Sequence, residues 1–211
     1  MISEAEPKSI PILRAAPNLF VPDTLYLIGT CWMTGATNTT AHLPTLCPRS
    51  SHMDRSLIET YVAGPAKLRA AVAGLTREDL TARPGPGAWS ILEVVVHIAD
   101  SDAISIDRMK RMLSEDNPAL LYADETAYVQ RLLTHDQDIE DALTLLEVGR
   151  RQWARVLRLL PDEAFARSGQ HNRRGTVTVA GYVASYIDHI DDHLKFIEGK
   201  RANLGKPLTC R

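Results

Sequence analysis

The feature that most constrains the fold of this chain is a helical spacing of apolar residues that recurs in four long segments. In each segment, apolar side chains return every three or four residues, which places them on one face of an α-helix. No segment shows a convincing strand pattern. The helices predicted from this spacing cover residues 54–75, 90–116, 139–160 and 179–201. Four such helices without strands indicate an all-α protein, folded as an antiparallel or crossed-over four-helix bundle.

The second of these helices has a clear start signal. Ser90 and Glu93 form a capping box, in which the hydroxyl accepts from the amide of residue 93 and the carboxylate accepts from the amide of residue 90. The β-branched run at 94–96 would by itself suggest a buried strand. Because the cap precedes that run and the apolar repeat continues after it, we expect a helix of over twenty residues, ended by Asn117-Pro118.

Other local signals punctuate the remaining segments. Gly64-Pro65 predicts a kink in the first helix, and Thr76 with Asp79 resembles a second capping box. A short connecting helix is expected over 126–133. Residues 169–175 read as a loop that leads to the last helix.

The first 52 residues differ from the rest of the chain. Six prolines interrupt any periodic pattern there, and residues 34–40 are small and polar. We therefore expect a poorly ordered extension over 1–52 and one bundle domain over 53–205. Met53 opens the patterned part, so it is an alternative start of translation.

Cysteine usage and hydropathy point to a cytoplasmic protein. The three cysteines are odd in number and lie near the two ends of the chain, so they make no disulfide framework for its middle: Cys31, Cys47 and Cys210. The apolar stretch 19–33 is broken by Pro22 and Asp23 and carries no clear basic leader. It predicts neither a signal peptide nor a membrane span.

The charge of the chain is nearly balanced, with 24 basic and 26 acidic residues. It therefore lacks the long-range attraction that nucleic acid or an anionic membrane surface would require. With 45% hydrophobic and 24% charged residues, the composition is that of an ordinary globular domain. We expect a small-molecule substrate or a protein partner, and neither nucleic acid nor membrane.

Three histidines lie on the apolar faces of two predicted helices. His189 and His193 are four residues apart, so their Cβ atoms are roughly 6 Å apart on one face, and His97 lies in the apolar stripe of the second helix. Facing helices of bundles often build metal sites from such side chains. Three neutral imidazoles suit Zn²⁺ or Ni²⁺ and leave a position open for catalysis. The alternative is a set of hydrogen-bonded packing histidines, since this pair lacks the glutamate of a HExxH motif.

Several motifs in order resemble the DinB/YfiT superfamily. The segment 87–102 has a tryptophan followed by a helical histidine and then an aspartate, as in the family's second helix. Residues 114–118 and 122–125 are similar to its acidic, proline-bearing connector, and 171–178 leading into 188–194 to its histidine-glycine loop and HxxxH helix. The resemblance covers residues 53–201. It implies a DinB-like four-helix bundle, with His97, His189 and His193 as ligands of a divalent metal, and it makes a homodimer plausible.

Other residues near these positions have two readings each. Asp100, one turn from His97, would orient an imidazole or bind water, or else is a solvated surface charge. Tyr182 and Tyr186 line a cavity or are plain core. His171 is a pocket-rim residue or, more simply, a solvated loop residue.

Four further side chains have simpler interpretations. Glu93 is explained by its cap and Trp89 by core packing, and His135 is read as a surface residue. Phe196 follows His193 on the helix face that we expect to point inward. His42 and His52 lie in the extension and receive no role.

The predicted metal supports two chemistries. It would activate water for a hydrolase, or stabilise the thiolate of a low-molecular-weight thiol for a thiol S-transferase. The resemblance implies both, because the family is associated with metal-dependent hydrolases and with transferases that use bacillithiol or mycothiol. A reading of another class is a non-catalytic, metal-binding stress-response module.

Overall fold

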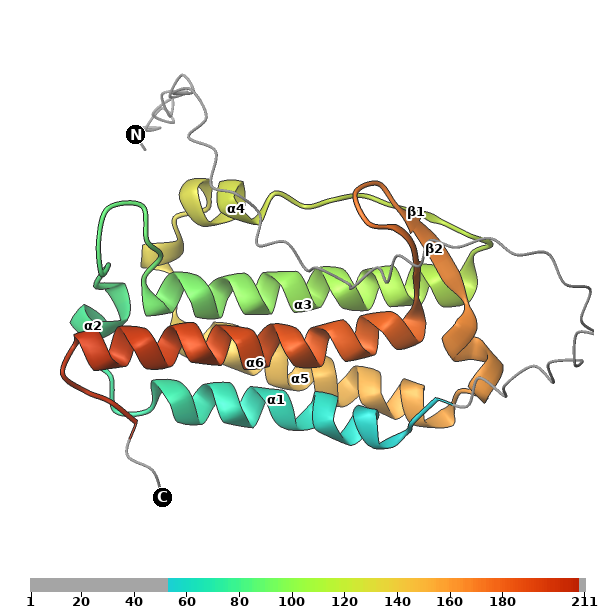
Figure 1. Cartoon of the computed structure of the whole chain (residues 1–211), viewed down its shortest axis with the longest axis horizontal. Coiled ribbons are helices and arrows are strands. Elements are labelled where there is room, and N and C mark those ends of the chain that lie inside the picture. Colours follow the sequence, from blue (N-terminus) through green and yellow to red (C-terminus); the bar gives the residue numbers. More distant parts are fainter. Residues whose placement is uncertain (1–52, 209–211) are drawn as a thin grey trace, which may run out of the picture. The chain divides into compact units, whose positions relative to one another are not determined.

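The computed structural model describes residues 53–208, and four long helices dominate it (Figure 1). They are α1 (Ser56–Val72), α3 (Ile91–Ser114), α5 (Ile139–Leu159) and α6 (Val179–Asn203). The shorter helices are α2 (Arg77–Thr81), α4 (Glu125–Arg131), and the 3₁₀ turns η1 (Thr134–Asp136) and η2 (Asp162–Ala166). The predicted four-helix bundle and its short connecting helix are confirmed. The extension over 1–52, all three cysteines, His42 and His52 lie outside the described residues.

The four helices pack around the bundle in the cyclic order α1, α5, α3, α6. Neighbours α3 and α5 run in the same direction, as do α1 and α6, while α3 and α6 run in opposite directions (Figure 1). This order requires a long connection from the end of α3 back to the start of α5, and α4 lies within it. Consecutive long helices α1 and α3 are therefore diagonal rather than adjacent.

The capping signals act as predicted. Ser90 caps α3 and Thr76 caps α2, each in a reciprocal capping box with the carboxylate three residues later. Pro65 lies inside α1, and the helix is continuous across it from Ser56 to Val72. A proline in a helix removes one backbone hydrogen bond. Here tertiary packing outweighs that loss, because Gly64 and Pro65 are both buried against the rest of the bundle.

A small sheet replaces the loop that was expected over 169–175. Its strands are β1 (Ala119–Leu120), β2 (Ser168–His171) and β3 (Gly175–Thr178), in the order β1-β2-β3. Strand β1 is parallel to β2, and β2 pairs antiparallel with β3. The prediction of no strand was wrong because β2 and β3 have only four residues each, too few to show an alternating pattern, and β1 lies about fifty residues from β2 in sequence. The sheet ties the α3–α5 connection to the hairpin that precedes α6.

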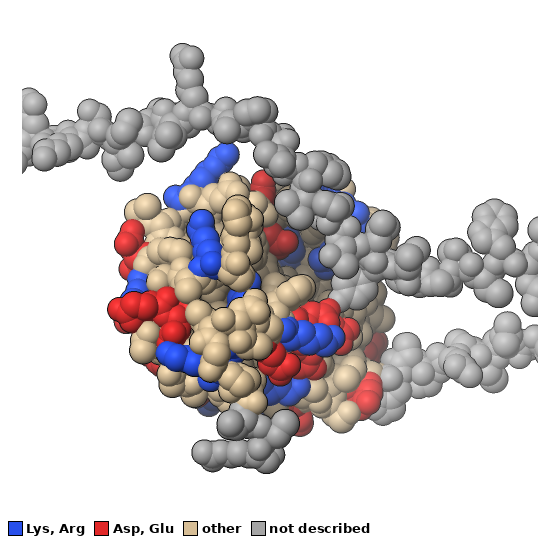
Figure 2. Space-filling view, turned by 60° about the vertical axis from the view of Figure 1, so that its left-hand side comes forward, with Lys and Arg blue, Asp and Glu red and all other residues tan. Residues whose placement is uncertain are grey.

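The outer surface carries both signs of charge. Lys and Arg side chains are intermixed with Asp and Glu on the face shown in Figure 2. This matches the near-zero net charge of the sequence. Within residues 53–208, none of the helices has the length and apolar character needed to cross a membrane.

A buried ion pair joins all four long helices between two apolar clusters of the core. Arg150 of α5 is fully buried, and its Nε donates to Asp102 of α3 at 2.8 Å. Arg150 also donates to the backbone carbonyls of Tyr61 in α1 and Tyr186 in α6, at 2.9 and 2.7 Å. The Tyr61 hydroxyl donates to the other carboxylate oxygen of Asp102 at 3.1 Å. Gly64 leaves room for this guanidinium, since a Cβ there would lie 2.8 Å from Arg150 Nη1.

Arg150→Met will lower the free energy of unfolding by about 3–5 kcal/mol, because it leaves the Asp102 carboxylate buried without its counter-charge. Urea unfolding followed by circular dichroism measures the loss. Arg151→Met is the matched control: this neighbouring arginine is exposed, and within residues 53–208 its one ion pair is the weak intrahelical one with Glu147. We expect it to change stability by less than about 0.5 kcal/mol. Equal effects of the two changes would contradict a central role for the buried pair.

Candidate metal centre

The structure brings together the three histidines from α3 and α6. Nε2 of His189 lies 3.2 Å from Nε2 of His97 and 3.0 Å from Nε2 of His193. One ligand atom from each of the three residues falls within 4.8 Å of the other two. The rings meet edge to face, with centroids 4.6 to 5.1 Å apart. Three imidazole nitrogens therefore converge on one point inside the bundle.

The antiparallel register of α3 and α6 produces this convergence. His97 lies opposite the turn of α6 that carries His189 and His193, so one imidazole faces two. One turn further along both helices, Ser101 Oγ contacts the Tyr186 hydroxyl at 3.2 Å. The i,i+4 spacing, with a single histidine across from it, is what allowed the sequence to indicate this cluster.

Burial keeps the three imidazoles neutral. It lowers the pKa of His97 to about 3, that of His189 to about 2 and that of His193 to about 4. Neighbouring histidines lower the first two further. A neutral imidazole has a free nitrogen lone pair, which is the form that binds metal. The site is therefore electrostatically prepared for a cation at neutral pH.

The three residues fit a metal ion better than they fit a hydrogen-bonded cluster. Ligand nitrogens about 2.0–2.1 Å from a tetrahedral ion lie roughly 3.3 Å apart, close to the separations seen here. Nδ1 of His189 and Nδ1 of His193 are buried and have no hydrogen-bond partner among residues 53–208. Neither nitrogen is therefore engaged in an alternative network that would explain the cluster as simple packing.

Aromatic side chains surround the histidines. The ring of Trp89 lies 5.2 Å from that of His97, and the ring of Tyr186 lies 5.5 Å from that of His189. Tyr186 is buried and Trp89 is half-buried. Phe196 was expected to face inward, but it is 60% exposed, with its ring 5.8 Å from that of His193. The helical face turns outward there, which places Phe196 at the outer edge of the site.

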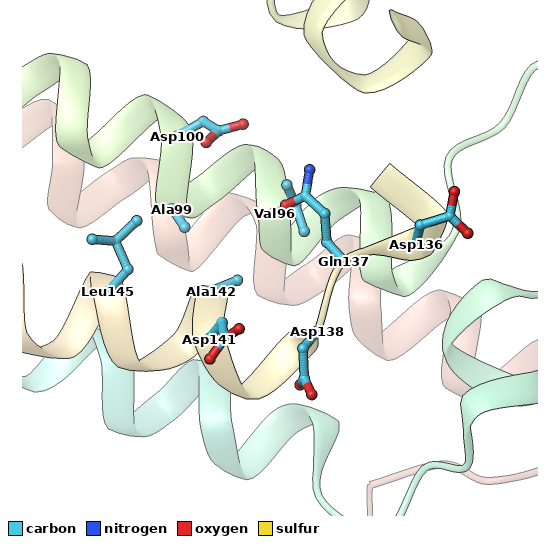
Figure 3. A pocket seen from close by; sticks show the side chains of 9 residues that line it. All are labelled: Val96, Ala99, Asp100, Asp136, Gln137, Asp138, Asp141, Ala142 and Leu145. Atoms are coloured by element: carbon cyan, nitrogen blue, oxygen red, sulfur yellow. The ribbon is translucent and has the colours of Figure 1, made fainter. Parts of the chain in front are cut away.

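A carboxylate beside the site that sequence reasoning missed is Glu125. Its Oε2 lies 3.9 Å from Nδ1 of His97, and it comes from the start of α4. Asp100 instead lines a cavity of about 390 Å³ between α3 and α5 (Figure 3). Burial raises the pKa of Asp100, and no described contact joins it to the three histidines. The carboxylate that lies near His97 therefore comes from α4 and not, as expected, from α3.

One of the two histidines outside the cluster differs from the expectation. His171 is only 5% exposed, and its Nδ1 accepts from the backbone amides of Arg173 and Arg174. The interpretation as a solvated loop residue was wrong, because the unpredicted strand β2 buries this ring. His135 lies at the surface, as expected, with 37% of its side chain exposed and its Nε2 3.0 Å from Ser90 Oγ at the start of α3.

The remaining assignments agree with the expectations. Glu93 is buried; burial opposes its ionisation, but Arg83 and the Ser90 amide together hold its pKa below the usual value. It serves the α3 cap and the ion pair with Arg83. Tyr182 is core, stacked on Tyr186 with ring centroids 5.8 Å apart.

Glu125→Gln will weaken metal binding by about 10-fold or more, because the carboxylate favours the proton on Nδ1 of His97 and so frees the Nε2 lone pair. Competition of the protein with a zinc chelator measures the affinity. Asp100→Asn is the matched control, since it removes a carboxylate that lies on α3 one turn from His97 but lines a different cavity. A larger effect of Asp100→Asn than of Glu125→Gln would show that the two carboxylates have been assigned the wrong way round.

Comparison with known proteins agrees with the fold. The model of the DinB superfamily matches residues 60–197. YfiT of Bacillus subtilis, named as a candidate metal-dependent hydrolase, is 31% identical over 142 residues, which cover 67% of this chain and 80% of YfiT. A protein of Oceanobacillus iheyensis with the same designation is 29% identical over 133 residues, covering 63% of this chain and 77% of its own length.

A solved structure of YfiT also matches. Its TM-score is 0.68 at 28% identity, and the match covers 78% of this chain and 94% of YfiT. That protein is described as having an unusual four-helix bundle topology. The family model alone spans more than half of the chain, and its range includes all three histidines. This chain belongs to the DinB superfamily.

Proposed function

We propose that this protein is a metal-dependent hydrolase whose divalent ion, Zn²⁺ or Ni²⁺, is held by His97, His189 and His193. The observation that carries the proposal is the convergence of three neutral imidazole nitrogens from two helices. Three protein ligands leave a coordination position open, as in catalytic rather than structural sites. The designation of YfiT as a candidate metal-dependent hydrolase supports the same reaction class.

The ion would supply Lewis acidity and lower the pKa of water toward about 7, which permits attack on an ester or amide at neutral pH. The protein supplies the surroundings. Glu125 lies beside His97 outside the cluster, and Tyr186, whose hydroxyl contacts Ser101, packs against His189. Trp89 and Phe196 flank the histidines with apolar surface, which suits an apolar part of a small-molecule substrate.

The same site would also stabilise the thiolate of a low-molecular-weight thiol, because imidazole-bound Zn²⁺ binds sulfur as well as oxygen. A thiol S-transferase is therefore the alternative enzyme. The two reactions share the histidines and differ in the second reactant. The experiment below separates them by supplying each reactant in turn.

The test uses untagged protein that is stripped of metal and reloaded with Zn²⁺ or Ni²⁺. It is assayed against nitrophenyl esters and anilides, and against an aryl halide with cysteine or another small thiol. We expect hydrolysis that is lost on chelation, restored by reloading, and absent in His193→Ala but retained in His135→Ala. Thiol-dependent transfer without hydrolysis would replace the hydrolase by the transferase. Stoichiometric metal without either activity would instead favour a binding module.

A further inference from the structure

The hairpin formed by β2 and β3 holds two arginines at a fixed place beside the bundle. His171, at the end of β2, accepts from the amides of Arg173 and Arg174 at 3.1 and 3.3 Å. Gly175 follows them with a positive φ of 71°, which a glycine adopts without strain. The buried side chain of His171 therefore holds the turn closed, and it fixes the backbone of both arginines.

Two more contacts connect this hairpin with α3 and with the segment that precedes α4. The Arg173 guanidinium lies over the ring of Tyr122, 3.4 Å from its centroid. Arg108 of α3 is 8% exposed and donates to the backbone carbonyl of Leu121, the residue before Tyr122. The hairpin, the connection to α4 and α3 therefore meet at a cationic cluster, defined here as Arg108, Arg173 and Arg174.

The charge of this cluster acts on the buried ring of His171. Burial lowers the pKa of His171, and all three arginines lower it further.

Nearby acids do not neutralise the whole cluster. Asp124 caps α4, and Glu125 lies beside His97. Burial raises the pKa of Tyr122, both carboxylates raise it further, and Arg173 lowers it. Within the described residues, neither Arg108 nor Arg174 forms an ion pair with a carboxylate. A nearly buried guanidinium without a counter-ion is costly, and in native proteins it usually has an anionic partner.

Two buried hydroxyls near Arg108 are also without acceptors. Ser105 Oγ and the Tyr182 hydroxyl have no hydrogen-bond partner among residues 53–208, and both side chains are at least nine-tenths buried. The Ser101–Tyr186 contact sets the register of α3 and α6, so Ser105 and Tyr182 lie opposite each other one turn further from the histidines. Ser105 precedes Arg108 by three residues on α3. The region therefore offers two hydroxyl donors without an acceptor, close to a guanidinium whose described hydrogen bond is to a backbone carbonyl and not to a carboxylate.

We propose that Arg108 and Arg174, with the hydroxyls of Ser105 and Tyr182, bind an anionic group of the substrate, a carboxylate or a phosphate. Ser105 lies eight residues from His97 on α3, about 12 Å along the helix axis. The substrate would thus carry its anionic group roughly that far from the reacting group, which lies at the histidines. The inference rests on the proposed function and specifies the substrate class of that site.

The experiment measures binding rather than turnover. Succinate and inorganic phosphate are titrated separately into the full chain by calorimetry at constant ionic strength, and the preferred anion identifies the carboxylate or the phosphate. We expect Arg174→Gln to raise the dissociation constant of the preferred anion by about 10-fold or more. Arg108→Gln should do the same and Arg108→Lys should recover part of the affinity, provided that the variants keep the wild-type circular dichroism. Arg151→Gln, an exposed arginine of α5, is the matched control and should leave binding unchanged.

The same titration in metal-free His193→Ala separates this inference from the proposed function. Binding of the anion should survive there, because its ligands are arginines and hydroxyls. Anion binding that disappears in His193→Ala but persists in Arg174→Gln would place the anion at the metal and overturn the inference. No binding to the wild-type chain at about 10 mM would overturn it as well. Loss of hydrolysis in the metal test would remove the proposed function but leave the anion titration unaffected.

Discussion

Metal-free protein will lose about 6 kcal/mol of unfolding free energy between pH 7.5 and pH 5 because three histidines must stay neutral in the folded state. Their pKa values in the fold are about 3, 2 and 4, below the ordinary 6.5. As the pH falls below 6.5, the unfolded chain therefore binds three protons that the folded chain does not bind. Each histidine contributes about 2 kcal/mol to the loss by pH 5. That sum is comparable to the whole stability of an ordinary domain.

The sign follows from the same comparison. A depressed pKa in the fold means that the contribution is fully present above pH 6.5 and is lost progressively as the pH falls towards the folded values. Urea unfolding of chelator-treated protein at several pH values measures the slope. His135→Gln, which changes a histidine outside the cluster, should leave the slope unaltered. A flat profile between pH 7.5 and 5 would mean that the three rings are not held neutral, and the description of the centre would fail.

Much of this fold was predictable because its signals are local. The apolar repeats of α1, α3, α5 and α6 lie within single helices, and the capping boxes at Thr76 and Ser90 span three residues each. The histidine cluster was predictable for a related reason. An i,i+4 pair fixes two imidazoles on one face by helix geometry alone, and a third histidine in a facing apolar stripe has few other places to point.

The errors lie where a residue depends on a partner far away in sequence. Strand β2 pairs with β1 across about fifty residues, and Gly169 leaves space that a Cβ would fill 2.9 Å from Leu120 Cδ1. No local pattern announces such a pairing, so His171 was taken for a loop residue. Asp100 was considered because it is one turn from His97, but the long connection brings Glu125 there instead.

The order of the helices around the bundle could not be predicted from the sequence either. Periodicity gives each helix an apolar face but does not say which helix that face meets. The cyclic order α1, α5, α3, α6 depends on the connection through α4, which carries the chain back along the bundle before α5 begins. That crossover is what puts α3 beside α6 and therefore His97 beside His189.

Purified wild-type protein reloaded with Zn²⁺ or Ni²⁺ will hold one ion per chain, and His193→Ala will hold almost none. Removing one of three imidazoles leaves two ligands, too few for a stable site on a borderline ion. His97→Ala and His189→Ala should behave alike, whereas His135→Ala should retain the full complement. Elemental analysis of untagged, dialysed protein measures the content. Stoichiometric metal in all three cluster variants would place the ion elsewhere in the chain.

His193→Ala should also make the stability of the metal-free protein less sensitive to acid. The substitution removes one of the three rings that must stay neutral, so the loss of stability between pH 7.5 and 5 should fall by about a third in the metal-free state. The slope with pH is the quantity to compare, because the cavity left by the ring lowers stability at every pH. A histidine that only packs in the core would give the smaller slope without any change in metal content. Loss of metal together with a gentler acid profile therefore identifies a buried neutral ligand, since it requires both the lone pair and the burial that keeps it free.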